Sequence, residues 1–168
     1  AKQRGRNLYQ AFNLEIHQRM LERAQIEQAL VQAMQRKEFR LLYQPKVSVR
    51  TGEVVGVEAL LRWRHPELGE LTPDRFISFA EESVLINQIG AWALIEACRE
   101  CARWRAQGLG DLSVAVNLSV RQLNGLELIR LVDQALSTSG LPARCLELEL
   151  TESVMMSDVQ LTMSTLGS

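Results

Sequence analysis

The chain has 168 residues, of which 46% are hydrophobic and 23% charged, and this composition excludes a disordered or fibrous protein. No apolar run approaches the roughly 18–20 residues needed to cross a bilayer, so we expect no direct membrane contact from this segment, although a longer parent chain could be membrane-anchored. The formal net charge of −1 argues against binding to a nucleic-acid polymer, although residues 1–40, with eight basic and four acidic side chains, carry +4.

A helix is expected first along the chain, over residues 13–37. Asn13 suits its N-cap, no Gly or Pro occurs between residues 14 and 37, and apolar side chains recur at helical spacing. This helix is either a connector or coiled-coil signalling element between domains, or it packs on the domain that follows. The pattern leaves both alternatives open.

From residue 39 onward, strands and helices alternate, and turn residues separate them. The expected elements are strands over 39–49 and 54–63, helices over 74–83 and 86–107, a strand over 113–119, a helix over 126–137, a strand over 145–151 and a helical start over 159–166. Pro66 and Gly69 mark a loop, Thr72 and Pro73 a helix N-terminus, and Gly108 a helix end. This order predicts an α/β domain built on parallel strands after an initial hairpin.

The three cysteines indicate a reducing compartment. An odd number cannot pair completely, and Cys98 and Cys101 fall within one expected helix. Their spacing would suit a zinc or redox site, but no second cysteine pair or nearby histidine completes a zinc ligand set. We therefore expect both to be small helix residues in a cytoplasmic protein.

Three expected strands carry an apolar row on one face and a polar row on the other. The polar rows contain Glu58, Asn117 and Glu149. We expect these side chains near the carboxyl ends of their strands, where (β/α) barrels build active sites. An open sheet with one solvated face would show the same alternation, and the pattern alone does not separate the two.

The residue types in these rows favour phosphate chemistry. Two carboxylates and an amide oxygen are hard ligands, which suit Mg²⁺ or Mn²⁺ better than zinc. Arg62 lies on the same strand as Glu58, and its guanidinium group can pair with a phosphate. A cation beside an arginine favours phosphoryl transfer, whereas two carboxylates alone would equally suit a glycosidase.

Five short motifs together resemble one bacterial family, the EAL domain, whose members hydrolyse cyclic di-GMP. They follow one another over roughly residues 38–160 in the family's order and spacing. The motifs are Tyr43-Gln44-Pro45, Glu58-Ala59-Leu60 with Leu61-Arg62-Trp63, Thr72-Pro73 with Phe76-Ile77, Asn117-Leu118-Ser119, and Glu149-Leu150-Thr151-Glu152. The resemblance implies a partial TIM-type (β/α) barrel of the EAL type, preceded by the long connector helix.

The resemblance also implies roles for individual side chains. Glu58, Asn117 and Glu149 would bind Mg²⁺ or Mn²⁺, and Glu152 would steady the loop after its strand. The residues expected to contact the substrate are Gln44, Leu61, Arg62 and Pro73. The implied reaction is attack by metal-activated water on one phosphodiester bond of cyclic di-GMP, which gives linear pGpG.

The resemblance divides the chain into three parts. Residues 1–12 resemble the end of a GGDEF-like domain, residues 13–37 form the connector helix, and residues 38–168 correspond to the N-terminal half of an EAL domain. The family's Asp-Asp-Phe-Gly-Thr-Gly segment, a strand lysine and a second catalytic glutamate do not occur here. We therefore expect the isolated chain to be inactive and the parent protein to be a homodimeric phosphodiesterase. The alternative is a non-catalytic regulatory module that binds cyclic di-GMP or dimerises.

Overall fold

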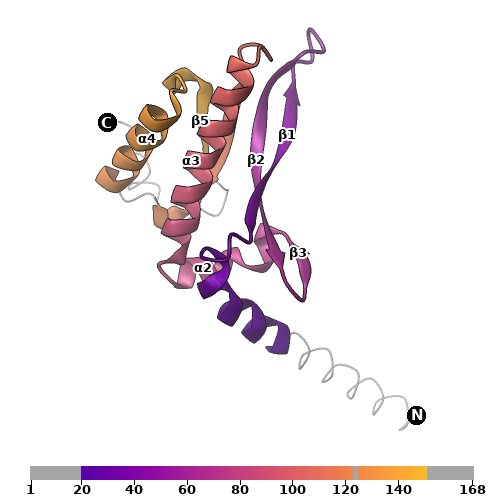
Figure 1. Ribbon diagram of the computed structural model, residues 1–168, viewed down its shortest axis with the longest axis vertical. Coiled ribbons are helices and arrows are strands. Elements are labelled where there is room, and N and C mark those ends of the chain that lie inside the picture. Colours follow the sequence, from indigo (N-terminus) through magenta and orange to yellow (C-terminus); the bar gives the residue numbers. More distant parts are fainter. Residues whose placement is uncertain (1–19, 123–124, 151–168) are drawn as a thin grey trace, which may run out of the picture.

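The computed structural model describes residues 20–122 and 125–150, which form one sheet with helices packed against it (Figure 1). The strands are β1 (Phe39–Val47), β2 (Val54–His65), β3 (Gly69–Leu71), β4 (Ser113–Leu118) and β5 (Leu146–Leu150). Their order is β1-β2-β4-β5, with β3 paired to β2. β1 and β3 run antiparallel to β2, whereas β2, β4 and β5 are parallel. This arrangement confirms the predicted α/β class and corresponds to part of a TIM-type barrel.

Helices cover the face of the sheet that carries the apolar rows. They are α2 (Ile77–Glu82), α3 (Leu85–Ala106) and α4 (Gly125–Ser139), together with the helical residues 20–33. Leu94 of α3 and Ala135 of α4 share one buried cluster with Val57 of β2 and Val114 of β4. None of the helices in the described part of the chain is long and apolar enough to cross a bilayer. The opposite face of the sheet carries most of the polar side chains of the strands, together with the paired Leu42 and Leu60.

The helical residues 20–33 pack on the domain that follows them. Their apolar stripe enters a second core cluster, which lies toward the far end of β2. The buried members of this second cluster are Ile26, Leu30, Ala33, Phe39, Trp63, Leu71, Phe76, Ala80, Ile86 and Ile89. The helix ends at residue 33, earlier than predicted, and a turn over 34–37 follows in which Lys37 has φ 55°. The structure thus shows packing on the chain's own domain. A connector role stays a prediction, and the expected GGDEF-like end over 1–12 lies outside the described residues.

The hairpin and the strand after it differ from the prediction. β1 ends at Val47, earlier than predicted, and β2 continues to His65, beyond its predicted end. The stretch predicted as a loop contains β3. A tight turn is the reason, because Nδ1 of His65 accepts hydrogen bonds from the backbone N–H groups of Glu67 and Leu68, both at 3.1 Å. This turn returns the chain onto β2.

The short helix predicted over 74–83 is divided at Phe76. A 3₁₀ turn (Pro73–Arg75) precedes α2, and Phe76 between them has φ −137°, outside the helical range. Its buried ring packs edge-on against Trp63, with 5.5 Å between the ring centroids. Thr72 occupies the predicted N-cap position, but its side chain makes no capping hydrogen bond. By contrast, α3, β4, α4 and β5 match their predicted bounds closely, while the helical start expected over 159–166 lies outside the described residues.

The three cysteines are part of the core. Cys98, Cys101 and Cys145 are all buried as free thiols, in agreement with the expectation for the two helical ones. Burial raises the pKa of Cys98 to about 11 and also raises the pKa of Cys101. The thiols of Cys98 and Cys101 are therefore protonated and poorly reactive near neutral pH, which suits a structural role.

Candidate functional site

The face of the sheet opposite α3 carries the predicted metal ligands. Side chains alternate along a strand, so Glu58 and Asn117 point away from Val57 and Val116, which belong to the core. Glu149 on β5 is the direct cross-strand partner of Asn117 on β4. The topology of the sheet therefore brings all three residues onto one face of neighbouring strands.

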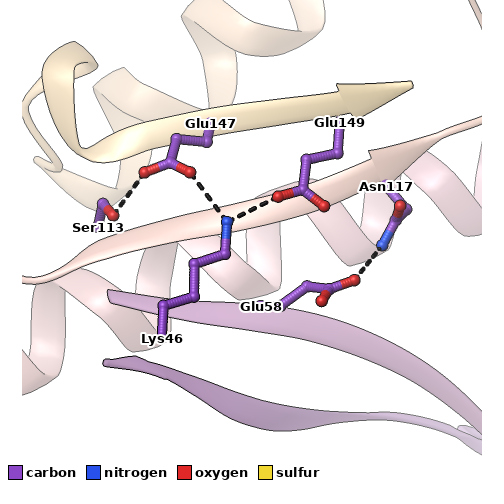
Figure 2. Close-up of polar contacts among 6 residues, drawn as sticks. All are labelled: Lys46, Glu58, Ser113, Asn117, Glu147 and Glu149. Carbon is purple, nitrogen blue, oxygen red and sulfur yellow. Dashed lines mark hydrogen bonds and ion pairs between the residues drawn. The ribbon is translucent and has the colours of Figure 1, made fainter. Parts of the chain in front are cut away.

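Asn117 is hydrogen-bonded to one carboxylate and is the cross-strand neighbour of the other. Its Nδ2 donates a hydrogen bond of 2.8 Å to Oε1 of Glu58 (Figure 2). In the same view, one carboxylate oxygen of Glu149 lies on the side of Glu58 and Asn117. The two carboxylates and the amide thus lie on one face of the sheet, and the amide NH2 group of Asn117 points at Glu58.

Glu58 does not lie near the carboxyl end of its strand, which corrects the prediction. β2 continues well beyond it to His65, whereas Asn117 and Glu149 are the penultimate residues of β4 and β5. The three residues still meet because the parallel pairing of β2 with β4 ends one residue after Glu58. The second half of β2 extends past β4 and pairs with the antiparallel strands β1 and β3.

A lysine that the sequence analysis did not single out lies beside Glu149. Nζ of Lys46 contacts Oε1 of Glu149 at 2.6 Å and Oε2 of Glu147 at 3.0 Å, and Oγ of Ser113 donates to Glu147 at 2.7 Å (Figure 2). The hydrogen bond to Glu149 raises the pKa of Lys46, and hydrogen bonds from Ser113 and Lys46 lower the pKa of Glu147. Lys46 could have been found from its position in the sequence. It follows Gln44 by two residues on β1, so both side chains lie on the same face of the strand.

The residues predicted to contact the substrate do not all share this face. Gln44 is exposed and lies directly opposite Glu58. Arg62 is on the same face of β2, and its Nη1 donates to the backbone oxygen of Leu61 at 2.7 Å. The side chain of Leu61 is partly buried and packs against the second core cluster, away from this face. Pro73 begins the 3₁₀ turn after β3, and Glu152 lies outside the described residues.

The segment that follows Asn117 is held against α2. Oγ of Ser119 donates a hydrogen bond of 2.6 Å to Oε1 of Glu81. The backbone N–H of Ser119 donates to Oε1 of Gln122 at 3.1 Å. Both contacts fix the chain directly after β4, and hence the end of the strand that carries Asn117. Sequence reasoning missed Glu81, which has no pattern signal because its partner, Ser119, is far from it in the sequence.

The donor set suits a hard divalent cation. Within residues 20–122 and 125–150, no three His, Cys, Asp or Glu side chains form a cluster able to hold a metal ion. The arrangement instead combines the carboxylates of Glu58 and Glu149 with the amide of Asn117. Oxygen ligands of this kind fit Mg²⁺ or Mn²⁺, and Mg²⁺ usually keeps several waters in proteins.

Comparison with known proteins places this arrangement in context. The profile of the EAL domain matches residues 27–166. The chain is 44% identical over 158 residues to the bifunctional diguanylate cyclase/cyclic di-GMP phosphodiesterase MucR of Pseudomonas aeruginosa, covering 94% of this chain and 23% of that protein. It is 37% identical over 166 residues to the cyclic di-GMP phosphodiesterase PdeR of Escherichia coli, covering 99% and 25%. The chain therefore spans about a quarter of the length of these curated relatives.

The fold is similar to that of a solved structure described as the PaMucR phosphodiesterase in complex with c-di-GMP. The TM-score is 0.80 at 43% sequence identity, over 85% of this chain and 58% of that one. The similarity extends to both the backbone and the sequence of the described strands and helices.

Proposed function

Because this chain belongs to the EAL-domain family, we propose that it supplies one part of a phosphodiesterase site that hydrolyses cyclic di-GMP to linear pGpG. The observation that carries the proposal is the meeting of Glu58, Asn117 and Glu149 on one face of the sheet. Two relatives are named as cyclic di-GMP phosphodiesterases, and one solved relative is a complex with c-di-GMP.

Glu58, Asn117 and Glu149 would hold a divalent cation, Mg²⁺ or Mn²⁺. When bound, such a cation polarises a phosphate oxygen and lowers the pKa of a coordinated water. The contribution of the chain is to fix the ligands in advance. The β4–β5 ladder sets Asn117 beside Glu149, and the hydrogen bond from Asn117 restrains Glu58.

Arg62 and Gln44 would contact the dinucleotide from the same face. A guanidinium group binds phosphate through two parallel N–H donors, and a glutamine amide both donates and accepts hydrogen bonds. Leu61 would contribute indirectly, since its side chain packs against the second core cluster and its backbone oxygen accepts a hydrogen bond from Arg62. Pro73 would contribute from the turn that follows β3.

We expect the isolated 168 residues to show no multiple turnover. The described residues supply three side-chain donors for a cation, and the second catalytic glutamate and further ligands that the resemblance implies do not occur in these 168 residues. The curated relatives are about four times longer than the matched segment. Turnover by the purified chain, free of contaminating enzyme, would contradict this expectation.

The test of the proposed function is hydrolysis of cyclic di-GMP with Mg²⁺ by the full-length protein and its variants. Glu58→Gln is expected to lower kcat/KM by about 100-fold or more, because it removes about 3 kcal/mol of transition-state stabilisation. The matched control is Glu53→Gln, an exposed glutamate outside β2 that should leave the rate unchanged. Equal rates for Glu58→Gln and the unsubstituted protein would contradict the site.

Calorimetric titration with cyclic di-GMP separates the two classes of function. Tight binding without any hydrolysis by the full-length protein would identify the non-catalytic regulatory module instead of an enzyme. Hydrolysis that depends on Mg²⁺ and on Glu58 would support the phosphodiesterase.

A further inference from the structure

Lys46 reaches across the sheet. It lies on β1, whereas Glu147 and Glu149 lie on β5, with β2 and β4 between them. In a flat sheet, three strand spacings would separate β1 from β5 by about 14 Å. The contacts of 3.0 Å to Glu147 and 2.6 Å to Glu149 therefore require the sheet to curl toward this face, which makes the face concave.

Small residues on β2 and β4 leave space for the side chain of Lys46. Lys46 is opposite Gly56 in the register of β1 and β2, and Gly56 is opposite Ser113 in that of β2 and β4. A Cβ atom at position 56 would lie 2.5 Å from Oγ of Ser113 and 3.0 Å from its carbonyl oxygen. This close approach requires glycine and leaves room above it for the ammonium group to reach β5.

We propose that Lys46 is a positioning residue for the metal site, which holds Glu149 with one carboxylate oxygen on the ammonium group and the other directed toward Glu58 and Asn117. The inference rests on the proposed function, in which Glu149 is a metal ligand. Oε1 of Glu149 receives the hydrogen bond from Lys46, and the second oxygen lies on the side of Asn117 in Figure 2.

A chain of contacts anchors the lysine itself. Glu147 and Glu149 are two residues apart and lie on the same face of β5. Their carboxylates therefore repel each other and would turn apart without a cation between them. Lys46 contacts both carboxylates, and Oγ of Ser113 donates a hydrogen bond of 2.7 Å to Oε1 of Glu147. The ammonium group is thereby held in one place, and so is the carboxylate of Glu149.

The same contacts contribute little to folding. The side chains of Lys46, Glu147 and Glu149 remain 33%, 49% and 38% exposed. Ion pairs with this exposure stabilise a fold by only about 0–1 kcal/mol, because solvent screens them. A role in stability alone therefore does not account for a lysine that spans the sheet, whereas orientation of a ligand does.

The test is Mn²⁺ affinity, measured by calorimetry on the full-length protein without substrate. Lys46→Met keeps the length of the side chain and removes its charge, and we expect Mn²⁺ binding about 10–100-fold weaker, the usual cost of losing a residue that orients a metal ligand. Lys46→Arg keeps the cation and should restore most of the affinity. Arg50→Met, at an exposed position in the β1–β2 turn, is the matched control and should bind as the unsubstituted protein does.

Whether Lys46→Met weakens or strengthens Mn²⁺ binding distinguishes orientation of Glu149 by the lysine from simple repulsion between the lysine and the cation. Removing a positive charge near a cation site would by itself strengthen Mn²⁺ binding. Equal or tighter binding by Lys46→Met, with urea unfolding unchanged, overturns the proposal. If the unsubstituted protein binds Mn²⁺ and Glu58→Gln does not, the metal site of the proposed function stands whatever Lys46→Met shows. If the unsubstituted protein binds no Mn²⁺, the proposed function fails and this inference fails with it.

Discussion

The side-chain amide of Gln122 lies against the bare Cα of Gly90, in the first half of α3. A Cβ atom at position 90 would come within 1.7 Å of Nε2 of Gln122, so this contact depends on glycine. Gln122 is buried there, and its Oε1 accepts the backbone N–H of Ser119. The pair therefore docks the chain after β4 onto α3, just beyond Asn117.

Gly90→Ala should destabilise the protein by up to about 2 kcal/mol. Alanine is the better helix former by about 1 kcal/mol, but Gln122 must move away and leave the N–H of Ser119 unpaired, which costs about 1–3 kcal/mol. Urea unfolding measures the change. In a Gln122→Ala background the obstacle is gone, and the same Gly90→Ala substitution should stabilise by up to about 1 kcal/mol. The same sign in both backgrounds would contradict the contact.

Leu30→Ala should destabilise the domain by about 2–5 kcal/mol. Leu30 is only 1% exposed, in the second core cluster, so its truncation leaves a cavity between the helical residues 20–33 and the sheet. The adjacent Val31 is 61% exposed and is the matched control, for which Val31→Ala should change the free energy of unfolding by less than about 0.5 kcal/mol. Similar small effects for both would show that the helix is not docked in solution.

Stability should fall as the pH rises from about 9 to 11. Burial raises the pKa of Cys98 from 9.0 to about 11, so the thiol in the unfolded chain loses its proton first, and this contribution is fully present only below pH 9. Unfolding in urea at several pH values measures the slope. Cys98→Ala, which removes the titrating group, should flatten the slope over this range relative to the parent. An unchanged slope would assign the loss to other groups.

Mg²⁺ or Mn²⁺ should raise the melting temperature of the unsubstituted protein, because a ligand that binds only the folded state stabilises it. Glu58→Gln should lose most of this increase, since it removes one ligand without disturbing the core. Scanning calorimetry with and without a chelator gives both values. An equal metal-induced increase in both proteins would place the cation somewhere else.

Alternation along single strands was enough to place the predicted metal ligands on one face. Asn117 and Glu149 follow from the pleat of β4 and β5, because a period of two fixes the face of each side chain whatever the neighbouring strands do. The same rule separates Leu61 from the site. Leu61 lies three residues after Glu58 on β2, so their side chains point to opposite faces although both residues belong to the same sequence motif.

Contacts that depend on curvature or on close approach could not be predicted in this way. Lys46 and Glu149 are 103 positions apart, and they meet only because the sheet curls. The turn after β2 escaped prediction for a different reason. A histidine side chain there supplies the acceptor that backbone groups usually provide, and turn propensities do not represent that interaction.

The reversed direction of β1 decides where the chain enters the domain. Phe39 pairs with Trp63 near the carboxyl end of β2, and β4 and β5 run parallel to β2. The helical residues 20–33 are therefore attached at the end of the sheet where the strands bearing Asn117 and Glu149 finish. A twist or pull along that helix would act on the rim of the candidate site before it acts on the opposite end of the sheet.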